Sequence, residues 1–392
     1  MPDNGVHSDI SVHHVLRFLG RVCERHNPLT AAQLNGFLRN PDGPTIPDDL
    51  LEVWRLPGAY SRALLRGIAV TSDGQPCFVA VIADKLITVC GKLGYLLPDA
   101  PDPTSRQFGC RVLGFDPSGK PITILRDGGA IRGEDGAHTA EDAPRGGMRF
   151  YRGSAFLFEE SALGDFRQAA VLRDDRIIVG LTGSDPLQEP DTVAYYRHDG
   201  TRDTDRKPFP VWRLQGLFAV SNGECYGIWG NEMVGGSFIV GHIGPREVTA
   251  LWNFDNSVGI PREIVETDNG IGVLIRDYEG HPSLYTLDGR TLLRDHIGKP
   301  EYSANYAELP DGRVVYMTRE TLDEHRLALV VNGVRQPYAF ECVSTCFRSA
   351  DEGWCYWAAY NERTLCRMRV PTPTDAEIAA AADGKPWHSD RA

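Results

Sequence analysis

The sequence predicts an all-β fold: a seven-bladed β-propeller, or a six-bladed one if one repeat is miscounted, preceded by a short N-terminal helical segment. The main observation is a hairpin pattern, in which an apolar stretch, a polar turn and a second apolar stretch follow one another, that recurs seven times. Its turns centre near Gly74, Gly119, Asp175, Gly223, Gly270, Gly312 and Gly353, so they lie 45, 56, 48, 47, 42 and 41 residues apart. A hairpin repeated every 40–45 residues or so is typical of one four-stranded propeller blade per repeat.

The composition divides the chain into a helical N-terminal cap or arm over 1–58, the propeller over 59–371 and a tail over 372–392. Apolar residues recur at three- and four-residue steps from Val12 to Cys23, which indicates an amphipathic helix. Pro47 and two acids precede the apolar sequence LLEVW, which predicts the start of a further helix there. The seventh blade is complete in the C-terminal sequence, so no N-terminal strand is expected to close the ring. The tail, rich in Pro and Ala, is expected to fray.

Charge and composition exclude several classes of partner. The net charge is −12 and the pI is near 5.4, which argues against nucleic acid as the main partner. The first residues have neither a basic start nor an apolar core, and no stretch is apolar enough to span a bilayer, so we expect a soluble cytoplasmic protein without a membrane partner. Most of the nine cysteines lie in apolar strand segments and are expected to be reduced thiols.

Two segments show the strand-and-turn rhythm most clearly. They are LALVVNGVRQPY from Leu327 and YAELPDGRVVYM from Tyr306, each with a strand, an Asn-Gly or Asp-Gly turn and a second strand. This rhythm resembles the TolB-like and WD40-like propeller repeats, over about residues 60–370. The resemblance implies a fold and leaves the activity open.

No local motif for catalysis, metal binding or a cofactor stands in the chain. The G-x-S-x-G, H-E-x-x-H, P-loop, G-x-G-x-x-G and EF-hand patterns are all absent. We therefore expect no metal ion and no cofactor, while the question of enzyme or binding protein stays open at this point.

The seven hairpins share one notable position, the second residue of each first strand. These residues are Arg66, Arg111, Arg167, Gln215, Arg262, Ser303 and Val343. Four arginines at equivalent positions predict a cationic collar around the channel mouth that binds an anion. The alternative is that each arginine pairs with an acid of a neighbouring strand, because polar groups such as Asp84, Asp127 and Glu320 fall at the same level.

Three tryptophans, Trp212, Trp229 and Trp252, lie close in sequence to polar residues that include Asn231. They are expected either to pack between blades or to form the wall of an aromatic pocket. The first function hypothesis is a binding or scaffold protein that holds a small anionic ligand or a protein partner at the channel mouth and rim. Its ligand contacts are Arg66, Arg111, Arg167, Arg262, Trp229 and Asn231. The alternative is a propeller hydrolase or lyase that acts on a small anionic molecule, with Glu232, His242 and Asp277 as acid/base groups.

Overall fold

The computed structural model describes twenty-two stretches of the chain. They are residues 51–55, 65–71, 76–82, 85–90, 93–100, 109–126, 147–161, 168–172, 174, 176–182, 189–205, 209–220, 222–231, 236–244, 247–267, 270–277, 282–294, 303–309, 313–319, 326–346, 353–359 and 364–382. The amphipathic stretch predicted between Val12 and Cys23 lies outside them.

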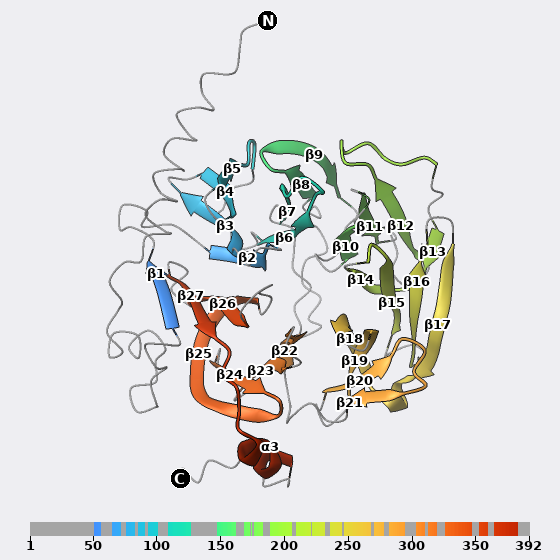
Figure 1. The fold of residues 1–392 in the computed structure, drawn as a ribbon. Helices are drawn as coiled ribbons and strands as arrows, with labels where there is room; N and C mark the ends of the chain where they lie inside the picture. Colours follow the sequence, from blue (N-terminus) through green and yellow to red (C-terminus); the bar gives the residue numbers. More distant parts are fainter. Residues whose placement is uncertain are drawn as a thin grey trace, which may run out of the picture.

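Antiparallel sheets make up almost all of the described structure (Figure 1). Five of them have four strands each, paired in chain order. They consist of β2 (Leu65–Val70), β3 (Pro76–Ile82), β4 (Lys85–Cys90) and β5 (Leu93–Leu96); β6 (Gly109–Phe115), β7 (Pro121–Arg126), β8 (Met148–Arg152) and β9 (Ala155–Glu160); β10 (Ala169–Val171), β11 (Ile177–Leu181), β12 (Asp191–Tyr196) and β13 (Phe209–Val211); β14 (Leu214–Ala219), β15 (Cys225–Asn231), β16 (Ser237–Ile243) and β17 (Val248–Asp255); and β18 (Ile260–Thr267), β19 (Gly270–Arg276), β20 (Pro282–Thr286) and β21 (Leu292–Arg294). A short 3-10 helix, η2 (Asn256–Val258), joins β17 to β18.

The sixth sheet has seven strands and contains two sets of four that share one strand. It is built from β22 (Ser303–Glu308), β23 (Val314–Arg319), β24 (Arg326–Val331), β25 (Val334–Cys346), β26 (Trp354–Ala359), β27 (Thr364–Arg369) and β1 (Leu51–Arg55). The first part of β25 pairs with β24, and its last five residues, from Cys342 to Cys346, pair with β26. Because one strand belongs to both sets, the number of blades stays a prediction.

The first strands of successive sheets contact one another around a centre, so the sheets are arranged as a ring (Figure 1). β2 contacts β6, and the contacts continue in order through β10, β14, β18 and β22. The ring is closed by a contact between β25 and β2. In each four-stranded sheet the first strand is therefore innermost and the fourth lies at the outside. In the seven-stranded sheet, β22 and β25 are the strands that contact the first strands of the neighbouring sheets.

The strand β1 corrects two expectations. The residues Leu51–Arg55 were predicted to form a helix, but they pair with β27 antiparallel, Leu51 opposite Met368 and Arg55 opposite Thr364. The C-terminal chain was predicted to complete the last blade alone, yet it supplies only part of β25 together with β26 and β27. The free edge of β27 offers backbone groups that need partners, and Val53 and Trp54 favour a strand that can provide them.

The C-terminal tail also differs from its prediction. Residues Asp375–Ala382 form a helix, α3, where the sequence was expected to fray. Thr374 and Glu377 form a capping box at its start: the Thr374 amide donates to Glu377 Oε2 at 2.8 Å, and the Glu377 amide donates to Thr374 Oγ1 at 3.3 Å. This reciprocal pair satisfies two amides at the helix N-terminus, which an unstructured tail would leave to water.

The core lies between neighbouring sheets. Each of four apolar clusters combines buried residues from two consecutive sheets of the ring, for example Phe150 and Phe158 with Tyr196. The rings of Phe158 and Tyr196 stack at 4.0 Å across the junction of their two sheets. Burial of such faces is the main stabilising contribution in a fold of radially arranged sheets.

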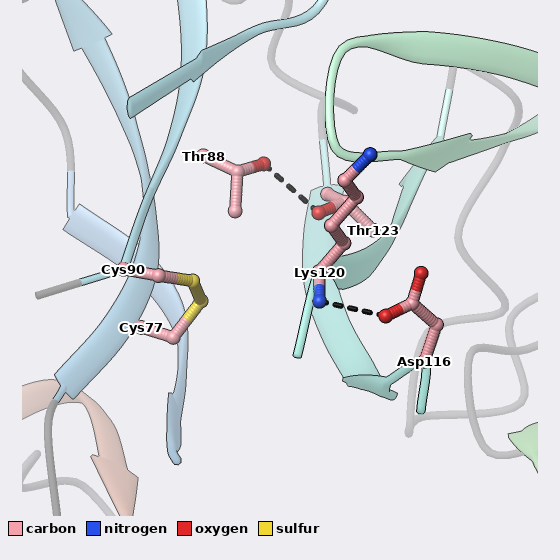
Figure 2. Close-up of a disulfide and its surroundings, with 6 residues drawn as sticks. All are labelled: Cys77, Thr88, Cys90, Asp116, Lys120 and Thr123. Atoms are coloured by element: carbon pink, nitrogen blue, oxygen red, sulfur yellow. Dashed lines mark hydrogen bonds between the residues drawn. A yellow bond between two sulfur atoms is a disulfide. The ribbon is translucent and has the colours of Figure 1, made fainter. Parts of the chain in front are cut away.

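The junction between the first two sheets of the ring contains a disulfide and a buried polar contact (Figure 2). Cys77 and Cys90 lie directly opposite each other on β3 and β4 and are joined by the disulfide, which corrects the expectation of reduced thiols for this pair. The hydroxyls of Thr88 and Thr123 share a hydrogen bond of 2.9 Å across the junction. Cys225 is a free, buried thiol whose pKa is raised by burial to about 12, so it behaves as a small apolar side chain.

Candidate functional site

The two faces of the ring differ in which strand ends they carry. On one, which we call the upper face, the innermost strands begin, at Gly109, Leu214 and Ile260, and the second strands end, at Arg126, Asn231 and Arg276. The register shows this directly, with Gly109 opposite Arg126 and Ile260 opposite Arg276. On the other, the lower face, the innermost strands end in tight hairpins such as the turn at Gly119. Because every repeat is the same unit, equivalent positions of different sheets lie at the same face.

Two of the predicted collar arginines lie exposed at the upper face. Arg111 is the third residue of β6 and Arg262 the third residue of β18, both on innermost strands, and both side chains are exposed to solvent. Arg66 is the second residue of β2 and lies opposite Val79 of β3. Arg167 lies outside the described residues. The structure therefore places three of the four arginines on strands that surround the ring centre.

Further polar residues reach the upper face from the ends of second strands. Arg126 ends β7, Arg276 ends β19, and Asp277 follows directly, all three half-buried. Arg111, Arg126, Arg262, Arg276 and Asp277 each already take part in at least one interaction. The collar and the ion-pair alternatives therefore both remain compatible with this arrangement.

A β-bulge occupies the collar position in two sheets. The pairing of β18 with β19 shifts between Pro261 and Glu263, so Arg262 is the extra residue. The pairing of β14 with β15 shifts between Leu214 and Gly216, so Gln215 is the extra residue there. A bulge turns the extra side chain away from the regular alternation of the strand, and such irregularities gather near functional sites. The apolar–polar pattern of the sequence did not reveal these bulges, because in both strands an apolar residue, Leu214 or Pro261, precedes the polar extra residue, as it would in a regular strand.

The connection between β13 and β14 is another part of the upper face, and it carries one of the three tryptophans that the sequence analysis singled out. It consists of Trp212, with 53% of its surface exposed, and Arg213. The residue that follows, Leu214, is held by two buried polar side chains: its amide donates to Asp191 Oδ2 at 2.7 Å, and its carbonyl accepts from Gln168 Nε2 at 2.8 Å. A solvent-exposed tryptophan thus lies on a backbone that the preceding sheet holds in place.

The other two tryptophans of the group pack against apolar clusters, Trp229 as a buried residue and Trp252 as a half-buried one. Trp229 is 7% exposed and belongs to the apolar cluster between the third and fourth sheets, which favours packing over the predicted ligand contact for this residue. Trp252 packs on Phe254 at 4.1 Å and on Tyr285 at 5.5 Å. Of the three, Trp212 has the most exposed side chain, since Trp252 is half-buried and Trp229 is buried.

The predicted acid/base residues do not gather at one place. Asn231 lies opposite Ser237 at the upper end of β15, whereas His242 lies opposite Tyr226 at the lower end. Five residues of strand separate these two levels, about 17 Å along β15. Glu232 lies outside the described residues, and Asp277 lies at the upper face. A catalytic site that joins His242 with these residues stays a prediction without support from the pairing.

His242 has neighbours of its own at the lower face. Its ring lies 5.4 Å from that of Tyr226, whose hydroxyl donates to Glu224 Oε2 at 2.7 Å. Asn222 Nδ2 donates to the same oxygen at 3.1 Å. The hydrogen bonds from Tyr226 and then Asn222 hold the pKa of Glu224 below its ordinary value, so this carboxylate stays ionised and fixes the turn between β14 and β15.

No model of a protein family matches the sequence, and no curated protein matches it. Among solved structures, selenomethionine-substituted virginiamycin B lyase from Staphylococcus aureus is similar with a TM-score of 0.50, and the alignment covers 82% of this chain and 99% of that chain. The chain has the β-propeller fold. At 10% sequence identity the likeness extends to the fold alone, and the TolB-like or WD40-like repeat type stays a prediction.

Two further solved structures are more distant. A streptogramin B lyase matches with a TM-score of 0.48 and 11% identity, over 82% of this chain and 97% of that chain. BamB from Moraxella catarrhalis matches with a TM-score of 0.44 and 12% identity, over 83% of this chain and 98% of that chain. Neither likeness carries an argument about function.

Within the described stretches, no three His, Cys, Asp or Glu side chains are grouped so that they could hold a metal ion. In the same part of the chain, no helix has the length and the apolar character needed to cross a membrane.

Proposed function

We propose that this propeller is a binding protein whose upper face binds a small anionic ligand. The observation that carries the proposal is the position of Arg111 and Arg262, both exposed, near the start of innermost strands and on the same face of the ring. A guanidinium group binds a carboxylate or a phosphate through charge-assisted hydrogen bonds, often two at once. The innermost strands of all the sheets surround the ring centre, so residues of several sheets can contact one ligand there.

The charge of the chain makes a local cationic site necessary for this function. A net charge of −12 repels an anion at distances comparable to the Debye length, about 8–10 Å at physiological ionic strength. Arginines at the ring centre offset that repulsion where the ligand binds. Arg126 and Arg276 at the same face add positive charge that favours binding of an anion there. Asp277, next to Arg276, reduces that charge locally.

Calorimetric titration with inorganic phosphate and with acetate tests the proposal. Arg111→Gln and Arg262→Gln should each weaken binding of the better anion by about ten- to a hundredfold, because each removes charge-assisted hydrogen bonds of about 1.5–3 kcal/mol. Arg290→Gln is the matched control, since Arg290 is an exposed arginine in the hairpin between β20 and β21 at the lower face. This variant should bind the anion like the unchanged protein.

The melting temperatures of the same variants separate binding from structure. If the arginines serve only as ion pairs between blades, both substitutions lower the melting temperature and leave the affinity unchanged. That result would contradict the proposal. Binding of a protein partner at this face, and the hydrolase or lyase alternative, stay predictions that no observation of the described residues favours over a small anion.

A further inference from the structure

The connection between β13 and β14 exposes an aromatic side chain in an unusual position. Five large apolar side chains of the described residues are exposed, and four of them lie on the outermost strands of their sheets. These four are Leu93 on β5, Phe156 on β9, Leu251 on β17 and Leu292 on β21. The fifth, Trp212, lies on no strand: it directly follows the outermost strand β13 and lies two residues before the innermost strand β14, on the connection at the upper face. Packing within a sheet therefore does not account for its exposure.

The backbone of this connection adopts a conformation that its residues do not favour. Arg213 has a φ of 54°, in the left-handed region that bulky side chains rarely adopt. The amide of Gly230 donates to the carbonyl oxygens of both Trp212 and Arg213, at 3.1 Å and 3.0 Å. Gly230 itself has a φ of 119°, and a Cβ there would lie 2.3 Å from the Ser237 carbonyl oxygen. The surrounding fold thus imposes the conformation of Trp212 and Arg213.

Two buried side chains of the preceding sheet fix the end of the same connection. Asp191 is 6% exposed and Gln168 is 8% exposed, and between them they bind the amide and the carbonyl of Leu214. Burying a polar side chain costs free energy unless it is hydrogen-bonded. Two buried polar side chains that both bind Leu214 therefore fix the position of its backbone. Strain that is held in place by such contacts is found mainly at binding and catalytic sites.

Arg213, the residue after Trp212, adds a positive charge to the same connection. Within the described residues, no carboxylate forms an ion pair with its guanidinium group. A rigid aromatic surface next to a cation provides two complementary contacts: stacking for a flat ring and hydrogen bonds for an anionic group.

We propose that Trp212 and Arg213 form a subsite for a planar aromatic anion, in which the ring stacks on the indole and the carboxylate or phosphate binds the guanidinium group. The inference rests on the proposed function, because it identifies the class of anion that the upper face binds. It also follows from an observation of its own, a strained connection that two buried side chains hold in place.

Phenyl phosphate and inorganic phosphate are the probes that isolate the aromatic contribution. The unchanged protein should bind phenyl phosphate about two- to tenfold more tightly than inorganic phosphate, since aromatic stacking contributes about that factor. Trp212→Ala should remove this preference and leave the affinity for inorganic phosphate unchanged, and Trp212→Phe should restore most of it. Leu251→Ala, at an exposed apolar position on an outermost strand, is the matched control and should keep the preference.

Arg213→Gly tests the strained residue with a second readout. Glycine adopts a φ of 54° without strain, so the variant should melt at the same temperature or higher, while it binds both probes more weakly. A lower melting temperature together with unchanged binding would show that Arg213 has a structural role, and it would overturn this part of the inference.

The outcomes also separate this inference from the proposed function. Arg111→Gln and Arg262→Gln should weaken the binding of both probes by the same factor, because both probes carry a phosphate group. If these variants have no effect and Trp212→Ala abolishes the preference, the subsite stands and the collar fails. If phenyl phosphate binds no more tightly than inorganic phosphate, or if Trp212→Ala keeps the preference, the subsite is overturned.

Discussion

Asp116 shows how a single buried carboxylate stabilises a hairpin at the lower face. It accepts a hydrogen bond from the Lys120 amide at 2.8 Å (Figure 2). It also accepts one from the Ser118 hydroxyl at 2.7 Å, and it pairs with Arg152 of β8. Burial raises the pKa of this carboxyl, but the bonds from Ser118, Lys120 and Arg152 outweigh burial and hold the pKa below its ordinary value. The folded state therefore stabilises the ionised form of Asp116.

Asp116→Asn should destabilise the protein by about 1–3 kcal/mol at pH 7, because it removes the charge that the buried hydrogen bonds and Arg152 recognise. Since the pKa is lower in the folded state, this stabilisation is fully present above the unfolded value of about 3.9 and is lost as the pH falls through the folded value. The difference between the two proteins should thus shrink in acid. Urea unfolding followed by tryptophan fluorescence, at pH 7 and at about pH 3, measures it.

Asp288 provides the matched control for Asp116. It lies in the hairpin between β20 and β21 and accepts hydrogen bonds from the Thr286 hydroxyl at 2.7 Å and the Arg290 amide at 3.1 Å, but it is exposed. Asp288→Asn should change the unfolding midpoint much less. Equal effects of the two substitutions would show that burial at Asp116 is not the cause.

At the scale of single residues, the sequence predicted part of the candidate site. The arginine column rests on the repeat, and a repeat fixes the level and the strand of each member, as the positions of Arg111 and Arg262 illustrate. Which tryptophan is exposed did not follow from the pattern. Trp212 and Trp229 lie in similar surroundings in the sequence, and only the pairing of β14 with β15 shows that one lies on a connection and the other inside a sheet junction.

The strand β1 is the element for which the prediction from the sequence differs most from the structure. Its partner, β27, lies at the other end of the chain, so no local pattern identifies it. The hairpin between β24 and β25 is the opposite case: Asn332 and Gly333 supply the two positive φ values, 49° and 78°, that a tight two-residue turn requires. Local turn chemistry was therefore predictable, and pairing between distant segments was not.

Truncation measures the contribution of β1. A chain without residues 1–57 lacks the strand, whereas a chain without residues 1–45 keeps it. The longer deletion should melt about 5–10 °C below the shorter one, because it removes the strand hydrogen bonds with β27 and leaves the edge of that strand open. Differential scanning calorimetry of both proteins gives the difference. Equal melting temperatures would show that β1 does not stabilise the ring.

For the whole molecule, the fold and the function differ in how far the sequence determines them. The spacing of seven hairpins predicted a propeller, and the ring of sheets has that fold (Figure 1). The function that we propose depends on side chains that several sheets bring to one face, and such a site leaves no continuous motif. Arg111 and Arg262 are separated by 151 positions in the sequence, and the arrangement of the sheets as a ring brings both to the same face.

A crystal structure of the protein with phenyl phosphate tests the central claim, that the upper face binds an anion, most directly. We expect density for the ligand at the upper face, with its phosphate about 2.7–3.2 Å from a guanidinium nitrogen of Arg111 or Arg262. Density for the ring against Trp212 would add the aromatic contact. A structure in which carboxylates of neighbouring blades occupy both guanidinium groups, and in which no ligand lies at this face, would contradict the account.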